Sequence, residues 1–192
     1  SMGEGGAIVI NNAIHIEKAE ILREKGTNRS QFFRGQVAKY NWVDFGDSYL
    51  PSDLNAAYLW AQLEKADEIN NNRLVTWNAY NKAFLSLKTK GIIDLPTIPN
   101  GCTHNAHMFY IKCADLQTRQ AYIQFMKENG VLCVFHYVPL HSAPAGKKFG
   151  RFNGIDKYTT SESDRLVRLP LYFNMTDSDR EKVIMKTLEF FK

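Results

Sequence analysis

A run of hydroxyl, amide and guanidinium side chains around Gly26 could bind an anion. The run reads Lys25-Gly-Thr-Asn-Arg-Ser30, and Ser48 follows a short distance along the chain. Arg29 carries a planar guanidinium that matches phosphate with two parallel hydrogen bonds, while Asn28 and Ser48 add neutral donors. Gly26 permits a backbone conformation that other residues disfavour. Because the glycine pattern of a P-loop is absent, the spacing indicates either a different phosphate-binding loop or a solvated surface loop.

Histidine and cysteine side chains offer a second kind of chemistry. Cys133, His136 and His141 could close a tetrahedral zinc site, but their spacing is not that of the usual structural zinc motifs. His136 lies beside an aromatic stretch, where a hydrogen-bonded core histidine is the commoner outcome, whereas His141 lies in a loop and suits ligand binding. Cys113 and Cys133 fall in apolar runs, where cysteine usually acts as a small hydrophobe. The sequence therefore favours no metal centre and no cysteine nucleophile, with zinc as an alternative.

The elements that must position these side chains can be predicted from hydrophobic periodicity. The pattern predicts strands over residues 7–10, 108–113, 131–137 and 166–171, and helices over residues 13–25, 54–91, 116–128 and 176–191. Ser52 is a candidate N-cap for the long helix, and Asp53 falls in its first turn, where the helix dipole favours a carboxylate. Thr176 and Asp179 resemble a capping box with Asp in place of Glu. The asparagines at residues 70–72 are the expected position of any break in the long helix.

Length and composition indicate a folded chain that meets small anionic molecules. With 192 residues, of which 44% are hydrophobic and 12% aromatic, the chain can bury a sizeable core. The net charge of +4 is spread along the chain without a block of like charges, so no nucleic-acid partner is expected. No apolar run reaches the length of a membrane span, and the odd cysteine count favours a cytoplasmic location. Aromatic residues beside arginine at residues 31–34 favour a subunit interface over base stacking.

Six sequence segments, taken together, resemble those of a known enzyme family. They are Gly3-Glu-Gly-Gly-Ala7, Lys25-Gly-Thr-Asn-Arg-Ser-Gln-Phe-Phe33, Ser52-Asp-Leu-Asn-Ala-Ala57, His107-Met-Phe-Tyr110, His136-Tyr-Val-Pro-Leu-His141 and Leu169-Pro-Leu-Tyr172. In this order they resemble the DegT-type sugar aminotransferases across nearly the whole chain. The resemblance implies an α/β fold, namely the C-terminal part of a fold type I aminotransferase that depends on pyridoxal 5'-phosphate. It also implies transfer of an amino group from glutamate to a 4-keto-6-deoxy nucleotide sugar.

The same resemblance implies a division of the chain and a homodimer with shared active sites. Residues 1–53 would be a remnant of the large cofactor domain with its interface loop, residues 54–91 the long connecting helix region, and residues 92–192 the small C-terminal α/β domain. Relatives send the loop before the long helix toward the cofactor phosphate of the partner subunit, commonly with a Gly-x-Asn-x-Arg segment.

This chain departs from that segment, because Gly46-Asp-Ser-Tyr-Leu50 places Ser48 and Leu50 where Asn and Arg are usual. The residues expected to bind the cofactor are therefore Asn28, Arg29 and Ser48. For the nucleotide sugar, Tyr137 and His141 match the loop of the small domain that approaches this substrate in relatives.

The resemblance also implies a limit on what the chain does by itself. In the family, the Schiff-base lysine lies a few residues before the segment that matches Gly3 to Gly6, and this sequence has no lysine there. That lysine holds the cofactor covalently and moves the proton, and Lys18 and Lys25 belong to a charged helix where solvation is expected. We therefore expect no catalytic residue here, no cofactor bound to this chain alone, and association through the unpaired strand at residues 7–10. The alternative is a stand-alone, non-catalytic dimerisation or interaction module descended from such an enzyme.

Overall fold

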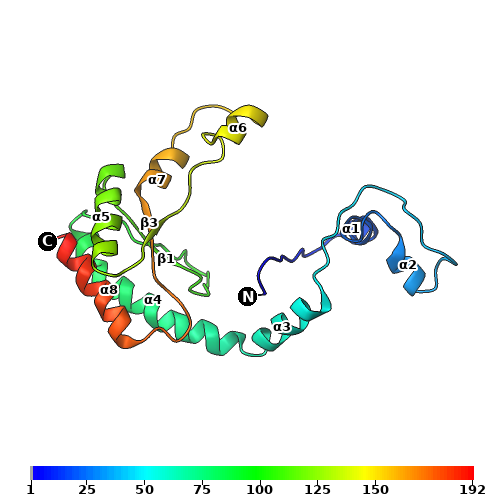
Figure 1. Ribbon diagram of the computed structural model, residues 1–192, viewed down its shortest axis with the longest axis horizontal. Coiled ribbons are helices and arrows are strands. Elements are labelled where there is room, and N and C mark those ends of the chain that lie inside the picture. The colour runs from blue at the N-terminus through cyan, green and yellow to red at the C-terminus, as the bar shows by residue number, and fades with distance from the viewer. Residues whose placement is uncertain (1) are drawn as a thin grey trace. The chain divides into compact units, whose positions relative to one another are not determined.

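The computed structural model describes residues 2–192, which form two compact units, one extending to Ala66 and the other from Asp67 to Lys192. The first unit contains a 3-10 helix, η1 (Ala13–His15), and the helices α1 (Ile16–Arg23), α2 (Arg29–Phe33) and α3 (Asp53–Leu63) (Figure 1). Among residues 2–66, Gly26 alone is buried. This unit therefore keeps its shape through hydrogen bonds between loops and helix ends, since it has no hydrophobic core of its own.

The predicted strand at residues 7–10 is wrong, because the segment pairs with no other strand among the described residues. Ile8 and Val9 are 78% and 83% exposed, although the sequence predicted that they would be buried. A strand needs neighbours to satisfy its backbone groups, and this segment has none among residues 2–192. The expectation that Ile8 would be left as exposed apolar surface is confirmed.

The predicted long helix consists of two helices, α3 and α4 (Ala66–Thr89). Ser52 caps α3 as predicted, since its hydroxyl accepts a hydrogen bond from the Asn55 amide at 3.3 Å. The break falls at residues 64–65 rather than at residues 70–72. Asn72 remains helical because its side chain makes a tertiary contact instead, accepting a hydrogen bond from the Asn174 amide at 2.8 Å.

The second unit contains a three-stranded antiparallel sheet. Its elements beyond α4 are β1 (Phe109–Lys112), α5 (Leu116–Glu128), β2 (Val134–Phe135), α6 (Pro144–Phe149), α7 (Thr159–Arg165), β3 (Leu166–Leu169) and α8 (Asp177–Phe190). The strand order is β1-β3-β2, and β3 is antiparallel to both neighbours. β1 and β2 are therefore parallel to each other, and α5 connects them, as a parallel connection requires.

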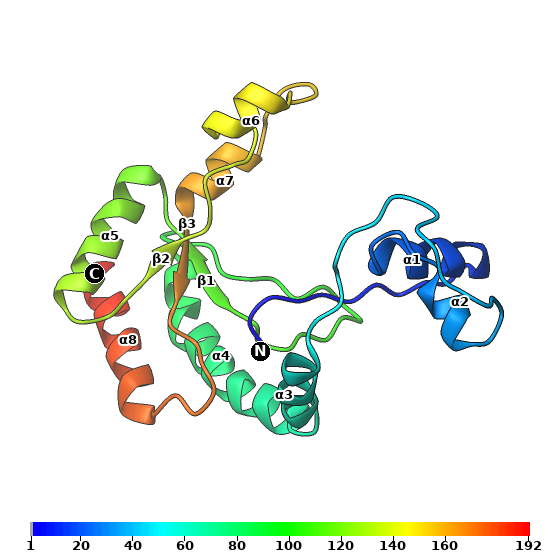
Figure 2. The same cartoon turned by 45° about the vertical axis from the view of Figure 1, so that its right-hand side comes forward.

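One face of this sheet packs against helices, and the opposite face does not. Along β1 the side chains alternate between buried and half-buried, and Phe109 and β3 residue Val167 are fully buried. The rings of Tyr80 and Phe84 from α4 lie 5.3 Å and 6.2 Å from that of Phe109. In both views, α5 and α8 lie on one side of the strands, while α6 and α7 lie beyond one end of β3 (Figures 1 and 2).

Polar contacts at helix ends complete the second unit. Thr176 caps α8 as predicted, accepting a hydrogen bond from the Asp179 amide at 3.1 Å, and its hydroxyl donates to the Asp179 carboxylate at 2.7 Å. Asp115 caps α5 through the Thr118 amide at 2.7 Å. Among residues 2–192, no helix combines the length and the apolar character needed to cross a membrane.

Candidate functional site

A cavity of about 280 Å³ in the first unit brings together two of the residues predicted to bind the cofactor. Its lining includes Arg23, Glu24, Lys25, Arg29, Ser48 and Leu50. Arg29 begins α2, whereas Ser48 lies in the loop before α3 and forms an isolated bridge with Glu24. Two segments that are separated in sequence thus form the walls of one cavity.

Gly26 allows its own segment to lie close to the loop that contains Asp44. Its φ of +73° lies in the left-handed region, and a Cβ atom added there would be 1.8 Å from the Asp44 carbonyl oxygen. The Gly26 carbonyl oxygen accepts hydrogen bonds from the amides of Val43 and Asp44 at 2.8 Å and 3.1 Å. Lys25, also at positive φ, donates its backbone amide to the Asp47 carbonyl. Only glycine satisfies both the backbone conformation and the space at this position.

Positive charge exceeds negative charge around the cavity. Three cations, Arg23, Lys25 and Arg29, line it together with a single carboxylate, that of Glu24. Glu24 is mostly buried and lies 3.6 Å from an Arg29 guanidinium nitrogen, and it also accepts a hydrogen bond from the Ser30 hydroxyl. The net excess of cations and the hydroxyl of Ser48 suit a bound phosphate.

Asn28, the third predicted cofactor-binding residue, does not line this cavity. Its amide oxygen accepts a hydrogen bond from the Asn41 backbone at 2.7 Å, and its amide nitrogen donates to the Gln31 side chain at 3.3 Å. Asn28 therefore holds the loop at Asn41 against the start of α2. Asn28 thus has a structural role beside the cavity and does not line it.

The second candidate region lies around His141 in the second unit. Its Nε2 atom is 3.0 Å from the Asp156 carboxylate, and the Phe152 ring lies 4.5 Å from the imidazole. Asp156 also accepts hydrogen bonds from the amides of Thr159 and Thr160 at 2.9 Å and 3.1 Å. The hydroxyl and backbone of Thr160, with the amide of Thr159 and the charge of His141, hold the pKa of Asp156 below its usual value. An ionised Asp156 therefore joins His141 to the start of α7.

Tyr137 is attached to the same helix. Its side chain is 63% exposed, and its backbone carbonyl accepts a hydrogen bond from the Ser163 hydroxyl of α7. The two residues predicted to bind the nucleotide sugar thus lie in segments that contact one short helix. That helix fixes their backbone positions while leaving the Tyr137 ring accessible.

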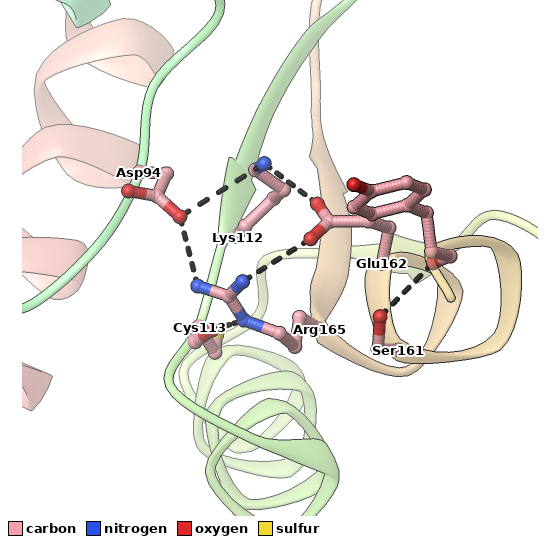
Figure 3. Close-up of polar contacts among 7 residues, drawn as sticks. Asp94, Lys112, Cys113, Ser161, Glu162 and Arg165 are labelled. Atoms are coloured by element: carbon pink, nitrogen blue, oxygen red, sulfur yellow. Dashed lines mark hydrogen bonds and ion pairs between the residues drawn. The ribbon is translucent and has the colours of Figure 1, made fainter.

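Four charged residues fasten α7 to the end of the sheet (Figure 3). Arg165 donates to the Asp94 carboxylate at 2.8 Å and to the Cys113 carbonyl at 2.7 Å. Lys112 of β1 lies 2.6 Å from the Glu162 carboxylate. This cluster was not predicted from the sequence. Asp94 and Lys112 are distant in sequence from Glu162 and Arg165, so their proximity depends on the fold.

The side chains named for the zinc alternative are not brought together within the described part of the chain. Among residues 2–192, no group of three histidine, cysteine or acidic side chains is arranged to hold a metal ion. Cys133 is buried in the core, where desolvation raises the pKa of its thiol to about 12, and His141 is paired with Asp156. A zinc ligand would need the thiolate form, which this environment disfavours.

The sheet order and the helical layer define an α/β chain. The sequence profile described as the DegT/DnrJ/EryC1/StrS aminotransferase family matches residues 1–188, and the chain belongs to that family. The uncharacterized protein MJ1066 of Methanocaldococcus jannaschii is 30% identical over 184 residues, which are 92% of this chain and 47% of that protein. The chain thus spans about half the length of this relative.

Solved structures show the same partial match. The aminotransferase TlmJ from Streptoalloteichus hindustanus has a TM-score of 0.76 and 22% identity, covering 94% of this chain and 46% of that chain. PseC from Helicobacter pylori is an aminotransferase involved in the biosynthesis of pseudoaminic acid. Its structure matches with a TM-score of 0.76 and 18% identity, and the match covers 95% of this chain and 47% of that chain. These likenesses confirm the predicted fold class, an α/β chain with part of the fold of an aminotransferase that uses pyridoxal phosphate.

Proposed function

We propose that this chain is the C-terminal portion of a pyridoxal-phosphate nucleotide-sugar aminotransferase that takes its amino group from glutamate. The family match and the cationic cavity lined by Arg29 and Ser48 support this proposal. The six ordered sequence segments further support one particular reaction, that of dTDP-4-amino-4,6-dideoxygalactose transaminase, which aminates a 4-keto-6-deoxy nucleotide sugar. The product would enter lipopolysaccharide or enterobacterial common antigen biosynthesis, and the working enzyme would be a homodimer.

The residues present fit the phosphate of the cofactor. Pyridoxal phosphate, when bound, supplies an aldehyde that carries the amino group and a ring that accepts electrons. In the proposed site, Arg29 provides a bidentate donor and Ser48 a hydroxyl, while Arg23 and Lys25 add positive charge. Leu50 lines the same cavity without a polar group, so Arg29 takes the role that an arginine has at that place in relatives.

For the nucleotide sugar, Tyr137 and His141 are the proposed binding residues. Because the Asp156 carboxylate accepts from Nε2–H of His141, a neutral ring keeps Nδ1 as an acceptor for a sugar hydroxyl. The exposed phenol of Tyr137 offers a donor and an apolar ring face. Their common attachment to α7 keeps both groups at a fixed separation.

The chain alone is proposed to lack transaminase activity, because its lysines are poorly suited to form a Schiff base. Lys18 is held in an ion pair with Asp44 and does not line the cavity. Lys25 lines the cavity on the side proposed to bind the phosphate. Borohydride treatment of the chain with pyridoxal phosphate should give no site-specific adduct, and a stoichiometric adduct on one lysine would contradict this part of the proposal.

Binding of a cofactor analogue tests the site directly. The probe is 4'-deoxypyridoxine 5'-phosphate, which has no aldehyde and cannot react with surface lysines. Calorimetric titration of the chain together with the lysine-bearing half of a family member should show binding that Arg29→Gln reduces by about tenfold and Ser48→Ala by a smaller factor. Arg151→Gln, which removes an equal charge from an exposed arginine outside the cavity, is the control. Equal binding by Arg29→Gln and Arg151→Gln would remove the cavity from the proposal.

A non-catalytic interaction module remains the second candidate function, and one observation favours it. The apolar side chains of α3 lie in solvent and include Leu54, Tyr58, Trp60 and Leu63. To separate the two functions, the chain is mixed with the lysine-bearing half of a family member, glutamate and the keto sugar nucleotide. Amination seen by mass spectrometry only in that mixture supports the enzyme, whereas binding of the two halves without product supports the module.

A further inference from the structure

The open face of the sheet carries an arginine at its centre. Arg168 lies on β3, the middle strand, and its direct cross-strand neighbours are Tyr110 on β1 and Val134 on β2. On a solvent-facing sheet, a charged residue is stabilised by an oppositely charged residue directly across from it. Here both cross-strand positions hold uncharged side chains, so the sheet provides no carboxylate for this guanidinium.

Arg168 differs in this respect from the other basic residues near the same sheet. Lys112 and Arg165 are both paired with Glu162 and Asp94, as Figure 3 shows. Arg168 makes no ion pair and no side-chain hydrogen bond with any residue between 2 and 192. Arg168 is half-buried as a residue, and its guanidinium is left free to bind an acceptor from outside the chain.

Further positive character gathers beside Arg168. Burial lowers the pKa of His136, and the charges of Arg168 and His107 lower it further. No carboxylate acts on His136 in the opposite direction. His107, His136 and Arg168, three groups that can carry positive charge, therefore lie close enough to interact electrostatically.

Arg168 also lines a cavity of about 280 Å³, which we call the Arg168 groove. The residues that matter for a ligand are His107, Met108, Leu132, Val134, Arg168 and Leu171. The groove thus combines a cationic side with an apolar side. Leu132 is 75% exposed, so this apolar side is accessible from solvent.

We propose that the Arg168 groove binds the phosphate group of a small molecule that has an apolar body. Arg168 receives the phosphate through paired hydrogen bonds, and His107 contributes a further donor. The apolar body covers Leu132, Val134 and Leu171. A phosphate suits the groove better than a carboxylate, because its second charge and additional oxygens interact with an imidazole as well as with the guanidinium.

This site is separate from the function proposed above. None of Arg29, Ser48, Tyr137 and His141 lines the Arg168 groove. Failure of the groove to bind phosphate would leave the aminotransferase proposal intact. Conversely, phosphate binding at Arg168 does not require the pyridoxal phosphate cavity.

Titration of the whole chain with phenyl phosphate tests the groove. Nuclear magnetic resonance follows the Nε–H signals of arginine and the methyl signals of Leu132 and Val134. We expect saturable shifts at Arg168, Leu132 and Val134, with Arg168→Gln weakening binding by about tenfold or more. Arg168→Lys, which keeps the charge but loses the planar fork, should show an intermediate loss. Arg151→Gln is the matched control and should bind as the parent chain does.

Leu132→Glu keeps the test decisive if both Arg168 variants fail to fold. Because Leu132 is largely exposed, a carboxylate there should leave the fold intact and repel the phosphate, abolishing the shifts. Benzoate is the competing probe and should bind more weakly than phenyl phosphate. Unchanged binding in Arg168→Gln or in Leu132→Glu, absence of saturation at millimolar phenyl phosphate, or benzoate binding of equal strength would each overturn the proposal.

Discussion

Cys113 and Cys133 lie in the hydrophobic core of the second unit, and burial controls their reactivity. Desolvation raises the pKa of each thiol to about 12, whereas Cys102 is exposed. Only the thiolate reacts with alkylating agents, and a pKa near 12 leaves about one part in ten thousand ionised at pH 8. At this scale, the surroundings of each side chain decide its chemistry more than its residue type does.

Alkylation should therefore distinguish the three cysteines. With iodoacetamide at pH 8, we expect mass spectrometry to find modification at Cys102 alone in the folded chain and at all three cysteines in denaturant. Cys102→Ser should leave no rapidly modified cysteine. Modification of Cys113 in the folded chain at the rate of Cys102 would show that the core opens readily.

The candidate binding residues could be predicted from the sequence only in part. The donors around Gly26 were predicted from the sequence as a candidate phosphate-binding set, and the structure places Arg29 and Ser48 on the lining of one cavity. The role of Asn28 in holding Asn41 was not predictable, because it depends on a tertiary hydrogen bond. Arg168 was assigned to a strand by periodicity, but the absence of a carboxylate partner appears only once the strand order is known.

Among the elements, α7 connects the sheet to both proposed substrate-binding residues. Arg165, the last residue of α7, donates hydrogen bonds to the Asp94 carboxylate and the Cys113 carbonyl. Ser163 of α7 donates to the Tyr137 carbonyl, and Asp156, which precedes α7, contacts His141. A seven-residue helix is too short to be stable without such contacts. The position of the proposed substrate loop therefore depends on the ion pairs at the far end of α7.

Arg165→Gln should loosen α7 and lower the stability of the second unit. Loss of the contacts with Asp94 and Cys113 is expected to cost about 1–3 kcal/mol, because the carbonyl and carboxylate lose a charged donor. Hydrogen exchange should become faster in α7 and at Tyr137. Arg151→Gln is the control, since Arg151 is exposed and its loss should change stability by less than about 0.5 kcal/mol. Equal effects of the two substitutions would show that the charged cluster does not fasten α7.

Helices with strong periodicity were predictable, and short elements were not. The prediction of a helix over residues 116–128 matches α5, and that over residues 176–191 includes α8. The short helices α6 and α7 have too few residues to show a period, and their stability comes from tertiary contacts. The apolar run at residues 7–10 had the composition of a strand, but strand formation requires a neighbouring strand, and the described residues place none beside it.

At the scale of the whole molecule, the two units differ in what stabilises them. The second unit has a core of aromatic and aliphatic residues from α4, β1, α5, β3 and α8. The first unit has Gly26 as its one buried residue among residues 2–66, with Trp42 and Phe45 largely exposed. Burial of apolar surface is the main source of stability, so the second unit should unfold at a higher temperature than the first.

Limited proteolysis should reveal this difference. Trypsin at low ratio is expected to cut first at basic residues of the exposed first unit, such as Arg23 and Lys39, and to leave a fragment containing residues from α4 onward. The control is the same digestion in urea, where sites in both units should be cut together. Early cleavage within α5 or α8, with an intact first unit, would contradict the assignment of stability to the second unit.

The alkaline stability of the second unit gives a global test of its buried ionisable groups. Burial raises the pKa values of Tyr80 and Tyr122 above their ordinary range, as it raises those of Cys113 and Cys133 to about 12. Each group is neutral when protonated, and its pKa is higher in the folded than in the unfolded chain. Its stabilising contribution is therefore complete below about pH 8.5 to 9 and is lost as the pH rises toward the folded value.

The melting temperature of the chain should stay nearly constant from pH 7 to pH 8.5 and then fall by roughly 5 °C or more by pH 11. A Cys113→Ala, Cys133→Ala double variant starts from a lower melting temperature, because it leaves cavities, but its decline between pH 8.5 and pH 11 should be shallower. Cys102→Ala removes an exposed thiol and should keep the parent slope. If the double variant declined as steeply as the parent, ionisation of the two core thiols would not contribute to alkaline unfolding.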